Sequence, residues 1–159
     1  MQQQYQFNYQ LFQHIQELSE SDALLLEKAR INTNLAYAPY SQFLVSASAM
    51  LSNGEIVTGT NQENASFPVG ICAERSLLAS AAALYPKAHV VTMAISYQSL
   101  KGSSNKPISP CGMCRQAIVE HQTRYRQTMR LILSGQTGLI FVIENAAALL
   151  PLAFTSKEI

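Results

Sequence analysis

Three cysteines in two short stretches could form a catalytic metal site. The first stretch, Cys72-Ala73-Glu74-Arg75, offers one sulfur, and the second, Pro110-Cys111-Gly112-Met113-Cys114-Arg115, offers two more. The chain contains 3 cysteines, so these stretches hold all of them. Zinc prefers sulfur and imidazole ligands, and catalytic zinc sites combine three protein ligands with one water. We therefore predict one zinc ion per chain, bound by Cys72, Cys111 and Cys114.

Glu74 could move protons beside this ion. It follows Cys72 by two residues, so it can flank the metal rather than bind it. Zinc lowers the pKa of a bound water toward roughly 7, and a nearby carboxylate can take up the proton. The alternative role is an acid that stabilises the first turn of a helix. Arg75 and Arg115 could hydrogen bond to the sulfurs and offset their net negative charge, or could form surface ion pairs instead.

Other uses of these cysteines are possible. A lone cysteine is often a small buried hydrophobic residue, and a C-x-x-C pair can be redox-active. The 3 histidines lie outside both stretches. We expect His14 and His121 to be solvated helix residues and His89 to lie at the edge of a strand, with none of them on the metal.

Composition limits the class of protein. A chain of 159 residues predicts a single domain. Hydrophobic residues make up 48% of the chain and charged residues only 13%. So few charges suggest that other subunits cover part of the surface. The net charge of +1 gives no electrostatic footprint for nucleic acid or an acidic membrane.

The sequence also indicates where the protein resides. No apolar run approaches the roughly 20 residues that span a bilayer. The first ten residues lack the positive charge of a secretory signal. We therefore expect a cytoplasmic protein.

The elements predicted to position these residues alternate between helices and strands. A helix begins after Ser19 or Ser21 and ends before Pro39, and Asn53-Gly54 indicates a hairpin turn. Strands are expected over residues 43–51, 55–60, 90–97, 130–133 and 139–142, and further helices over 71–85, 111–123 and 144–150. This order predicts an α/β fold of three α/β/α layers, with a mixed five-stranded sheet between helices. We divide the chain into an N-terminal extension, 1–18, which forms a short strand or an extended arm, and a catalytic domain, 19–159.

Several stretches together closely resemble the small, homotetrameric type of cytidine deaminase, within the cytidine and deoxycytidylate deaminase family. That class combines a Cys₃ zinc site with a glutamate that is not a ligand and a P-C-x-x-C motif. The matching stretches are Tyr37-Ala38-Pro39-Tyr40-Ser41 with Phe43, Asn61-Gln62-Glu63-Asn64-Ala65, residues 68–75 and residues 109–116. Two positions depart from the family pattern: Ser46 stands where glycine is common, and Phe67 where tyrosine is frequent.

The resemblance implies hydrolytic deamination of cytidine and deoxycytidine to uridine and deoxyuridine, with release of ammonia, in pyrimidine salvage. It implies that Glu74 passes a proton from water to the pyrimidine and then to the leaving amine. It further implies a homotetramer in which a neighbouring subunit walls the pocket. The substrate contacts that it implies are Phe43 stacking on the base, backbone groups of Ala73 and Ser109 on the base edge, Asn61 and Glu63 on the ribose 3′-hydroxyl, and Phe67 and Phe154 as the neighbour's wall.

Three other functions compete with this interpretation. Deaminases of aminonucleoside antibiotics share the cysteine and glutamate motifs, but the Asn61 and Glu63 pair favours a plain nucleoside. A polynucleotide editor is disfavoured by the neutral charge, and because a pocket that binds a free 3′-hydroxyl excludes a continuing strand. A zinc-stapled structural module would bind zinc without turnover and would have no use for Glu74.

Overall fold

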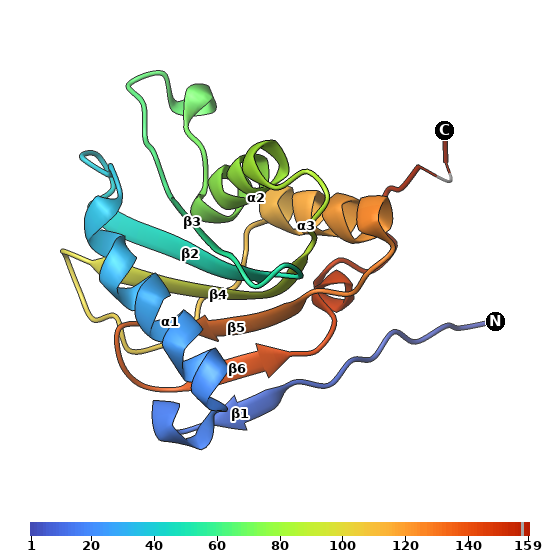
Figure 1. Cartoon of the computed structure of the whole chain (residues 1–159), viewed down its shortest axis with the longest axis horizontal. Helices are drawn as coiled ribbons and strands as arrows, with labels where there is room; N and C mark the ends of the chain where they lie inside the picture. The colour runs from blue at the N-terminus through green and yellow to red at the C-terminus, as the bar shows by residue number, and fades with distance from the viewer. Residues whose placement is uncertain (157) are drawn as a thin grey trace.

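A six-stranded mixed sheet forms the centre of the computed structural model, which describes residues 1–156 and 158–159 (Figure 1). The strand order is β1-β6-β5-β4-β2-β3. Strands β4 and β5 run parallel, and the other neighbouring strands pair antiparallel. The predicted α/β class is confirmed by this architecture. None of the helices in the described part of the chain is long and apolar enough to cross a membrane.

The elements follow the predicted order, with small differences at their ends. The strands are β1 (Gln10–Phe12), β2 (Phe43–Leu51), β3 (Ile56–Thr60), β4 (Val90–Ser99), β5 (Arg130–Ser134) and β6 (Ile140–Ile143). The α-helices are α1 (Glu20–Asn32), α2 (Ala73–Leu84) and α3 (Gly112–Tyr125). Short 3₁₀ turns are η1 (Ile15–Glu17), η2 (Thr33–Leu35), η3 (Phe67–Val69) and η4 (Ala146–Leu149).

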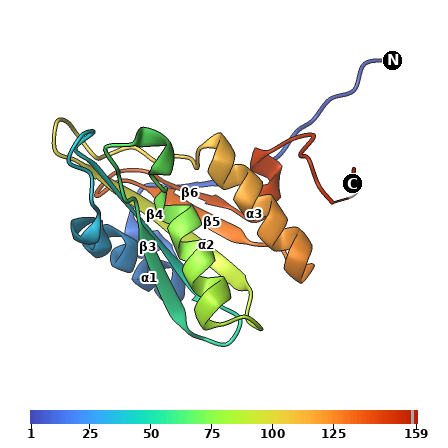
Figure 2. The same cartoon turned by 90° about the horizontal axis from the view of Figure 1, so that it is seen from above.

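Helices cover both faces of the sheet, as the three-layer prediction requires (Figures 1 and 2). Successive side chains of a strand point to opposite faces, so each strand feeds two cores. In β4, Met93 and Ile95 join the core beneath α2 and α3, whereas Ala94 joins the core beneath α1. The two cysteine stretches begin α2 and α3, so both lie on the same face of the sheet (Figure 2).

Two local predictions are confirmed. The Ser19 side chain accepts a hydrogen bond from the Asp22 backbone N–H at 3.2 Å, and so caps the start of α1. Strands β2 and β3 form the expected hairpin, in which Gly54 has a φ of 85°. This left-handed conformation suits glycine because glycine has no Cβ.

The sheet has six strands, one more than the five predicted. Residues 10–12 of the predicted extension pair with β6 through Gln10, Leu11 and Phe12 and add β1 at the edge. A strand of three residues is too short to produce an alternating pattern, so periodicity could not reveal it. The predicted helix over 144–150 is also shorter than expected and forms the 3₁₀ turn η4.

The prediction for His121 was wrong. Its side chain is 8% exposed, and its Nε2 accepts a hydrogen bond from the Val90 backbone N–H at 3.1 Å. Burial lowers the pKa of His121 to about 4, and the charges of His89 and Arg124 act in the same direction. His121 therefore joins α3 to the start of β4 as a neutral buried residue.

Gly59 allows α2 to approach the sheet closely. A Cβ built at residue 59 would lie 2.5 Å from the Ala73 carbonyl oxygen, and still closer to the Leu77 backbone nitrogen. Both atoms belong to the backbone of α2, which cannot move aside as the end of a flexible side chain could. The first turn of α2 follows Cys72 and contains Glu74. Its position thus depends on the absence of a side chain at Gly59 of β3.

We expect Gly59→Ala to lower the free energy of unfolding by about 1–3 kcal/mol or more, because α2 must shift away from β3. Gly102→Ala is the matched control, because a Cβ there would meet only the Ser99 hydroxyl, at an ordinary distance of 3.8 Å. The effect of the control should stay within about 0.5 kcal/mol. Urea unfolding of the wild type and both variants measures the difference. Equal midpoints for all three proteins would show that α2 does not depend on this close approach.

Candidate active site

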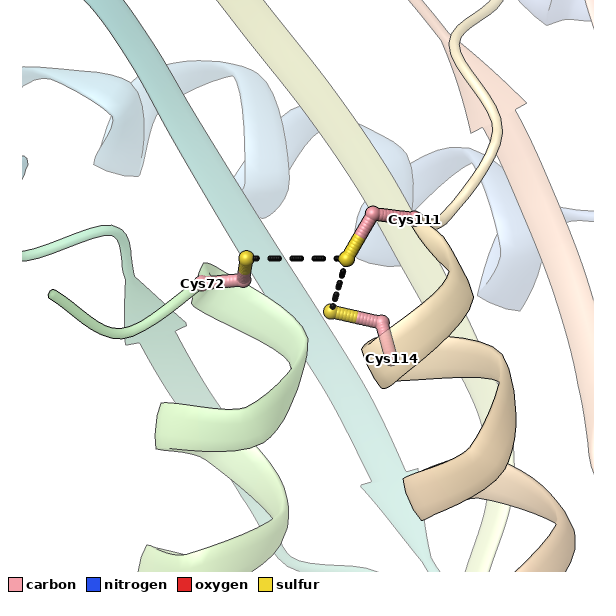
Figure 3. Close-up of side chains that lie close together, drawn as sticks. All are labelled: Cys72, Cys111 and Cys114. Atoms are coloured by element: carbon pink, nitrogen blue, oxygen red, sulfur yellow. Dashed lines mark hydrogen bonds between the residues drawn. The ribbon is translucent and has the colours of Figure 1, made fainter. Parts of the chain in front are cut away.

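The three cysteine sulfurs converge at the starts of two helices (Figure 3). Cys72 is the N-cap of α2, Cys111 is the N-cap of α3, and Cys114 lies in the first turn of α3. The Sγ atoms of Cys72 and Cys111 are 3.8 Å apart, and those of Cys111 and Cys114 are 3.4 Å apart. All three sulfurs lie within 4.8 Å of one another. The predicted ligands are therefore brought together, although two of them lie 39 residues apart in the sequence.

The spacing of the sulfurs fits zinc. Thiolate ligands lie about 2.3 Å from zinc, and a tetrahedral arrangement then places their sulfur atoms somewhat less than about 4 Å apart. The Cys111–Cys114 and Cys72–Cys111 sulfur–sulfur distances, 3.4 and 3.8 Å, agree with that spacing. A disulfide would instead require sulfur atoms about 2.05 Å apart. All three cysteines are free, and the unpaired backbone N–H groups at the two helix starts favour anionic sulfur at this point.

The electrostatics of the cluster favour a bound cation. The hydrogen bond with Cys114 lowers the pKa of Cys72, and the positive charge of Arg75 acts in the same direction. The hydrogen bond with Cys72 is the main cause that raises the pKa of Cys114, and burial of the Cys114 thiol raises it further. One thiolate is thus stabilised at the expense of its neighbour. A divalent cation removes that conflict because it stabilises all three thiolates at once.

Glu74 lies beside this cluster in a buried position. It is 5% exposed and occupies the first turn of α2. Burial raises the pKa of the Glu74 carboxyl, against the opposing effects of its own backbone N–H and of the Cys114 thiol. A carboxyl with a raised pKa both accepts and returns a proton more readily near neutral pH, which suits acid–base chemistry.

The two arginines differ in what they contact. The positive charge of Arg75 lowers the pKa of Cys72, but the predicted hydrogen bond from Arg75 to a sulfur is not found in the part of the chain that the structure describes. Arg115 does not make the predicted hydrogen bond to sulfur. Its Nε donates to the Pro110 carbonyl at 2.8 Å, and its Nη1 donates to the Leu149 carbonyl at 2.9 Å. The guanidinium therefore binds backbone just before α3 and at the end of η4.

A cavity of about 580 Å³ opens beside Cys72. Asn61, Glu63 and Cys72, which were predicted for the site, line it, and so does Phe67, which was predicted to wall the cavity of a neighbouring subunit. A cavity of this size is typical of small-molecule sites. Met113 of α3 also lines the cavity, which therefore joins the loop after β3 to the metal-binding helices.

Asn61 is fixed by the strand beside it. Its Oδ1 accepts a hydrogen bond from the Val45 N–H at 2.8 Å, and its Nδ2 donates to the Phe43 carbonyl at 2.9 Å. Both ends of the amide are thus bonded to the backbone of β2. This pairing fixes the orientation of the Asn61 side chain at the cavity wall.

Glu63 is held by a different backbone segment. Its Oε2 accepts hydrogen bonds from the backbone N–H groups of Tyr40 and Ser41, at 2.9 and 3.2 Å. The Ser41 side chain, these N–H groups and the charge of Lys101 lower the pKa of Glu63. Glu63 therefore faces the cavity as a carboxylate. Nothing in the sequence indicated that the backbone N–H groups of Tyr40 and Ser41 would bind Glu63.

The remaining predicted substrate residues, Phe43, Ala73, Ser109 and Phe154, do not line this cavity. Phe43 stacks on Tyr97 with ring centroids 4.7 Å apart, and Ala73 is buried as the first residue of α2. Ser109 is exposed, two residues before Cys111. Phe154 is 61% exposed, and its carbonyl accepts a hydrogen bond from Gln116 Nε2 at 2.8 Å.

The two departures from the family pattern lie in different surroundings. Ser46 is fully buried in β2, opposite Ser96 of β4, and neither hydroxyl has a hydrogen-bond partner among the described residues. Phe67 is 75% exposed, and its ring meets that of Tyr40 edge-on at 5.7 Å. An aromatic pair thus lies at the rim of the cavity.

Comparison with known proteins gives one consistent family. The family model "Cytidine and deoxycytidylate deaminase zinc-binding region" matches residues 19–129. A cytidine deaminase of Halalkalibacterium halodurans is 33% identical over 135 residues, which cover 85% of this chain and 95% of that protein. A cytidine deaminase of Mycoplasma pneumoniae is 43% identical over 90 residues, covering 57% of this chain and 64% of that protein.

Solved structures agree. The crystal structure of cytidine deaminase from Burkholderia pseudomallei superposes with a TM-score of 0.71 at 34% identity, covering 86% of this chain and all 100% of that one. The structure of cytidine deaminase from Mycobacterium tuberculosis superposes with a TM-score of 0.65 at 27% identity, covering 86% and 98%. Both likenesses extend over nearly the whole of the compared chains.

Proposed function

The chain belongs to the cytidine and deoxycytidylate deaminase family of enzymes, and we propose that it hydrolyses cytidine and deoxycytidine to uridine and deoxyuridine, with zinc as cofactor. The observation that carries this proposal is the convergence of three free sulfurs beside the buried carboxyl of Glu74. Cys72, Cys111 and Cys114 would hold one zinc ion per chain. When bound there, zinc supplies a Lewis acid that lowers the pKa of water to about 7.

Glu74 is the proton carrier in the proposed reaction. It accepts a proton from the attacking water and delivers it to N3 of the pyrimidine, while the water oxygen bonds to C4. It then transfers the proton of the new C4 hydroxyl to the amino group. The C4–N bond breaks, ammonia leaves, and the C4 carbonyl forms. One water is consumed and Glu74 regains its first state, so a single buried carboxyl with a raised pKa suffices for both transfers.

Backbone and side-chain groups of the predicted site would orient the nucleoside. The Ala73 backbone N–H, at the start of α2, and the Ser109 backbone suit the polar edge of the base, and Phe43 suits its face. A carboxylate offers about four acceptor positions, so two N–H bonds to Glu63 Oε2 leave Oε1 for the ribose 3′-hydroxyl. Asn61, which follows β3 and is fixed by its hydrogen bonds to the backbone of β2, would complete that contact.

We further propose a homotetramer in the cytoplasm, acting in pyrimidine salvage. Three free thiols favour a reducing compartment. Exposed Phe67 and Phe154 would wall the cavity of a neighbouring subunit, because large exposed apolar side chains often mark protein interfaces.

Light scattering of the active protein should give the mass of a tetramer. An active monomer would contradict the shared cavity wall.

Glu74→Gln should lower kcat/KM for cytidine at least about 100-fold, because an amide cannot carry the proton. The variant should keep one zinc per chain and the wild-type unfolding midpoint. The measurements are the absorbance change on conversion of cytidine to uridine and metal analysis of the same sample. Glu120→Gln, the same change at an exposed position of α3, is the control and should leave activity unchanged. A zinc-loaded wild type without turnover on any nucleoside would favour a structural module instead.

The ribose contact can be tested with a second substrate. For the wild type, 3′-deoxycytidine should have a kcat/KM lower than that of cytidine by roughly 10- to 150-fold, the value of a hydrogen bond to a charged group. Glu63→Ala should lower kcat/KM for cytidine and abolish most of this discrimination, because the acceptor is gone. Undiminished discrimination in the variant would remove Glu63 from ribose binding.

A further inference from the structure

Arg115 holds the backbone on both sides of Cys111. Its own backbone N–H donates to the Cys111 carbonyl at 2.9 Å, as the first helical hydrogen bonds of α3 require. Its side-chain Nε donates to the Pro110 carbonyl at 2.8 Å. Two consecutive carbonyls, those of Pro110 and of Cys111 itself, are thus bound by a single residue.

Cys111 needs such support more than the other two cysteines. Cys114 lies inside α3 and is fully buried. Cys72 adjoins the first turn of α2, which is seated on β3 at Gly59. Cys111 is exposed and follows the irregular segment between β4 and α3. Its position therefore depends on the backbone at Pro110, and Arg115 fixes that backbone.

The other end of the guanidinium has a firm anchor. Nη1 donates to the carbonyl of Leu149, a buried residue at the end of η4. The segment around η4 is itself attached to α3, since Gln122 Nε2 donates to Asn145 Oδ1 at 2.9 Å. From the other side, the Tyr5 hydroxyl donates to the Ala148 carbonyl at 2.9 Å. Arg115 thus connects the loop before Cys111 to a part of the chain that is fixed independently.

We propose that Arg115 is a positioning residue for the metal, acting through the Pro110 and Leu149 carbonyls rather than through the sulfurs. A planar guanidinium presents several donors in a fixed fork, so it can bind two carbonyls in defined directions at once. A lysine at this position would keep the positive charge but would lack the fork. Partners that hold metal ligands in place are typically worth about 10- to 100-fold in metal affinity. This inference rests on the proposed zinc site.

The test measures zinc affinity rather than activity. The zinc dissociation constant of the purified full-length chain is measured by competition with a chromophoric chelator, for the wild type, Arg115→Lys, Arg115→Met and Gln116→Met. We expect both Arg115 variants to bind zinc at least about tenfold more weakly. Cobalt(II) in place of zinc should give a shifted ligand-field absorption in both variants, because Cys111 is displaced.

Gln116→Met is the matched control. Gln116 follows Arg115 on the same helix and also donates to a C-terminal carbonyl, that of Phe154, whereas the bond to Pro110 belongs to Arg115. The zinc affinity and cobalt spectrum of this control should equal those of the wild type. Equal losses in Gln116→Met would mean that attachment of the C-terminal segment, and not the bond to Pro110, determines affinity, and would overturn the proposal.

The remaining outcomes also decide the question. Wild-type zinc affinity in Arg115→Lys would show that charge alone is required, and would overturn the positioning role. This variant also carries the test if Arg115→Met fails to fold, which urea unfolding reveals. A wild-type chain that takes up no zinc would overturn the proposed function together with this inference. Zinc-loaded wild type with unchanged Arg115 variants would overturn the inference alone.

Discussion

Three thiolates within 4.8 Å of one another repel strongly unless positive charge lies among them. Much of the fold on this face of the sheet supplies that charge or holds the sulfurs against the repulsion. Two helices begin at the cluster, so the positive ends of two helix dipoles face it. Arg75 adds a full charge nearby. A divalent ion would complete the balance, and this need for a cation would connect the sulfur geometry to the proposed activation of water.

The three sulfurs are held by three different means, and each depends on backbone. Cys114 is fixed by the helix that contains it, and Cys72 by the contact of α2 with Gly59 of β3. Cys111 is fixed by the carbonyls that Arg115 binds. The seat of α2 also sets the position of Glu74, which lies in the same first turn. The Glu74 carboxyl and the Cys72 sulfur are therefore held in a fixed position relative to each other, as acid–base chemistry at a metal requires.

The sequence predicted the parts of this site that depend on residue type and spacing. Cysteine and glutamate motifs indicated the metal cluster, and Asn53-Gly54 indicated the hairpin that carries Gly59. Contacts between a side chain and a distant backbone group could not be predicted. Every residue has a backbone carbonyl, so the sequence does not show which one a side chain will bind. Arg115 was expected to bind sulfur, and instead binds a carbonyl 34 residues away. His121 was expected to be a solvated helix residue, whereas it is buried and accepts a hydrogen bond from an N–H of β4, a strand distant in the sequence.

Strand β1 affects whether the edge of the sheet can pair with another chain. Without it, β6 would be the last strand of the sheet, and its backbone would be open along the apolar run Ile140-Phe141-Val142-Ile143. Open edges with such sequences invite pairing with other chains and lead to aggregation. Residues 10–12 cover this edge with a strand that is too short to pair with a strand of another chain. The ring of Tyr9 also covers that of Phe141, with ring centroids 4.8 Å apart. By covering this edge, residues 10–12 oppose pairing of β6 with a second copy of the chain.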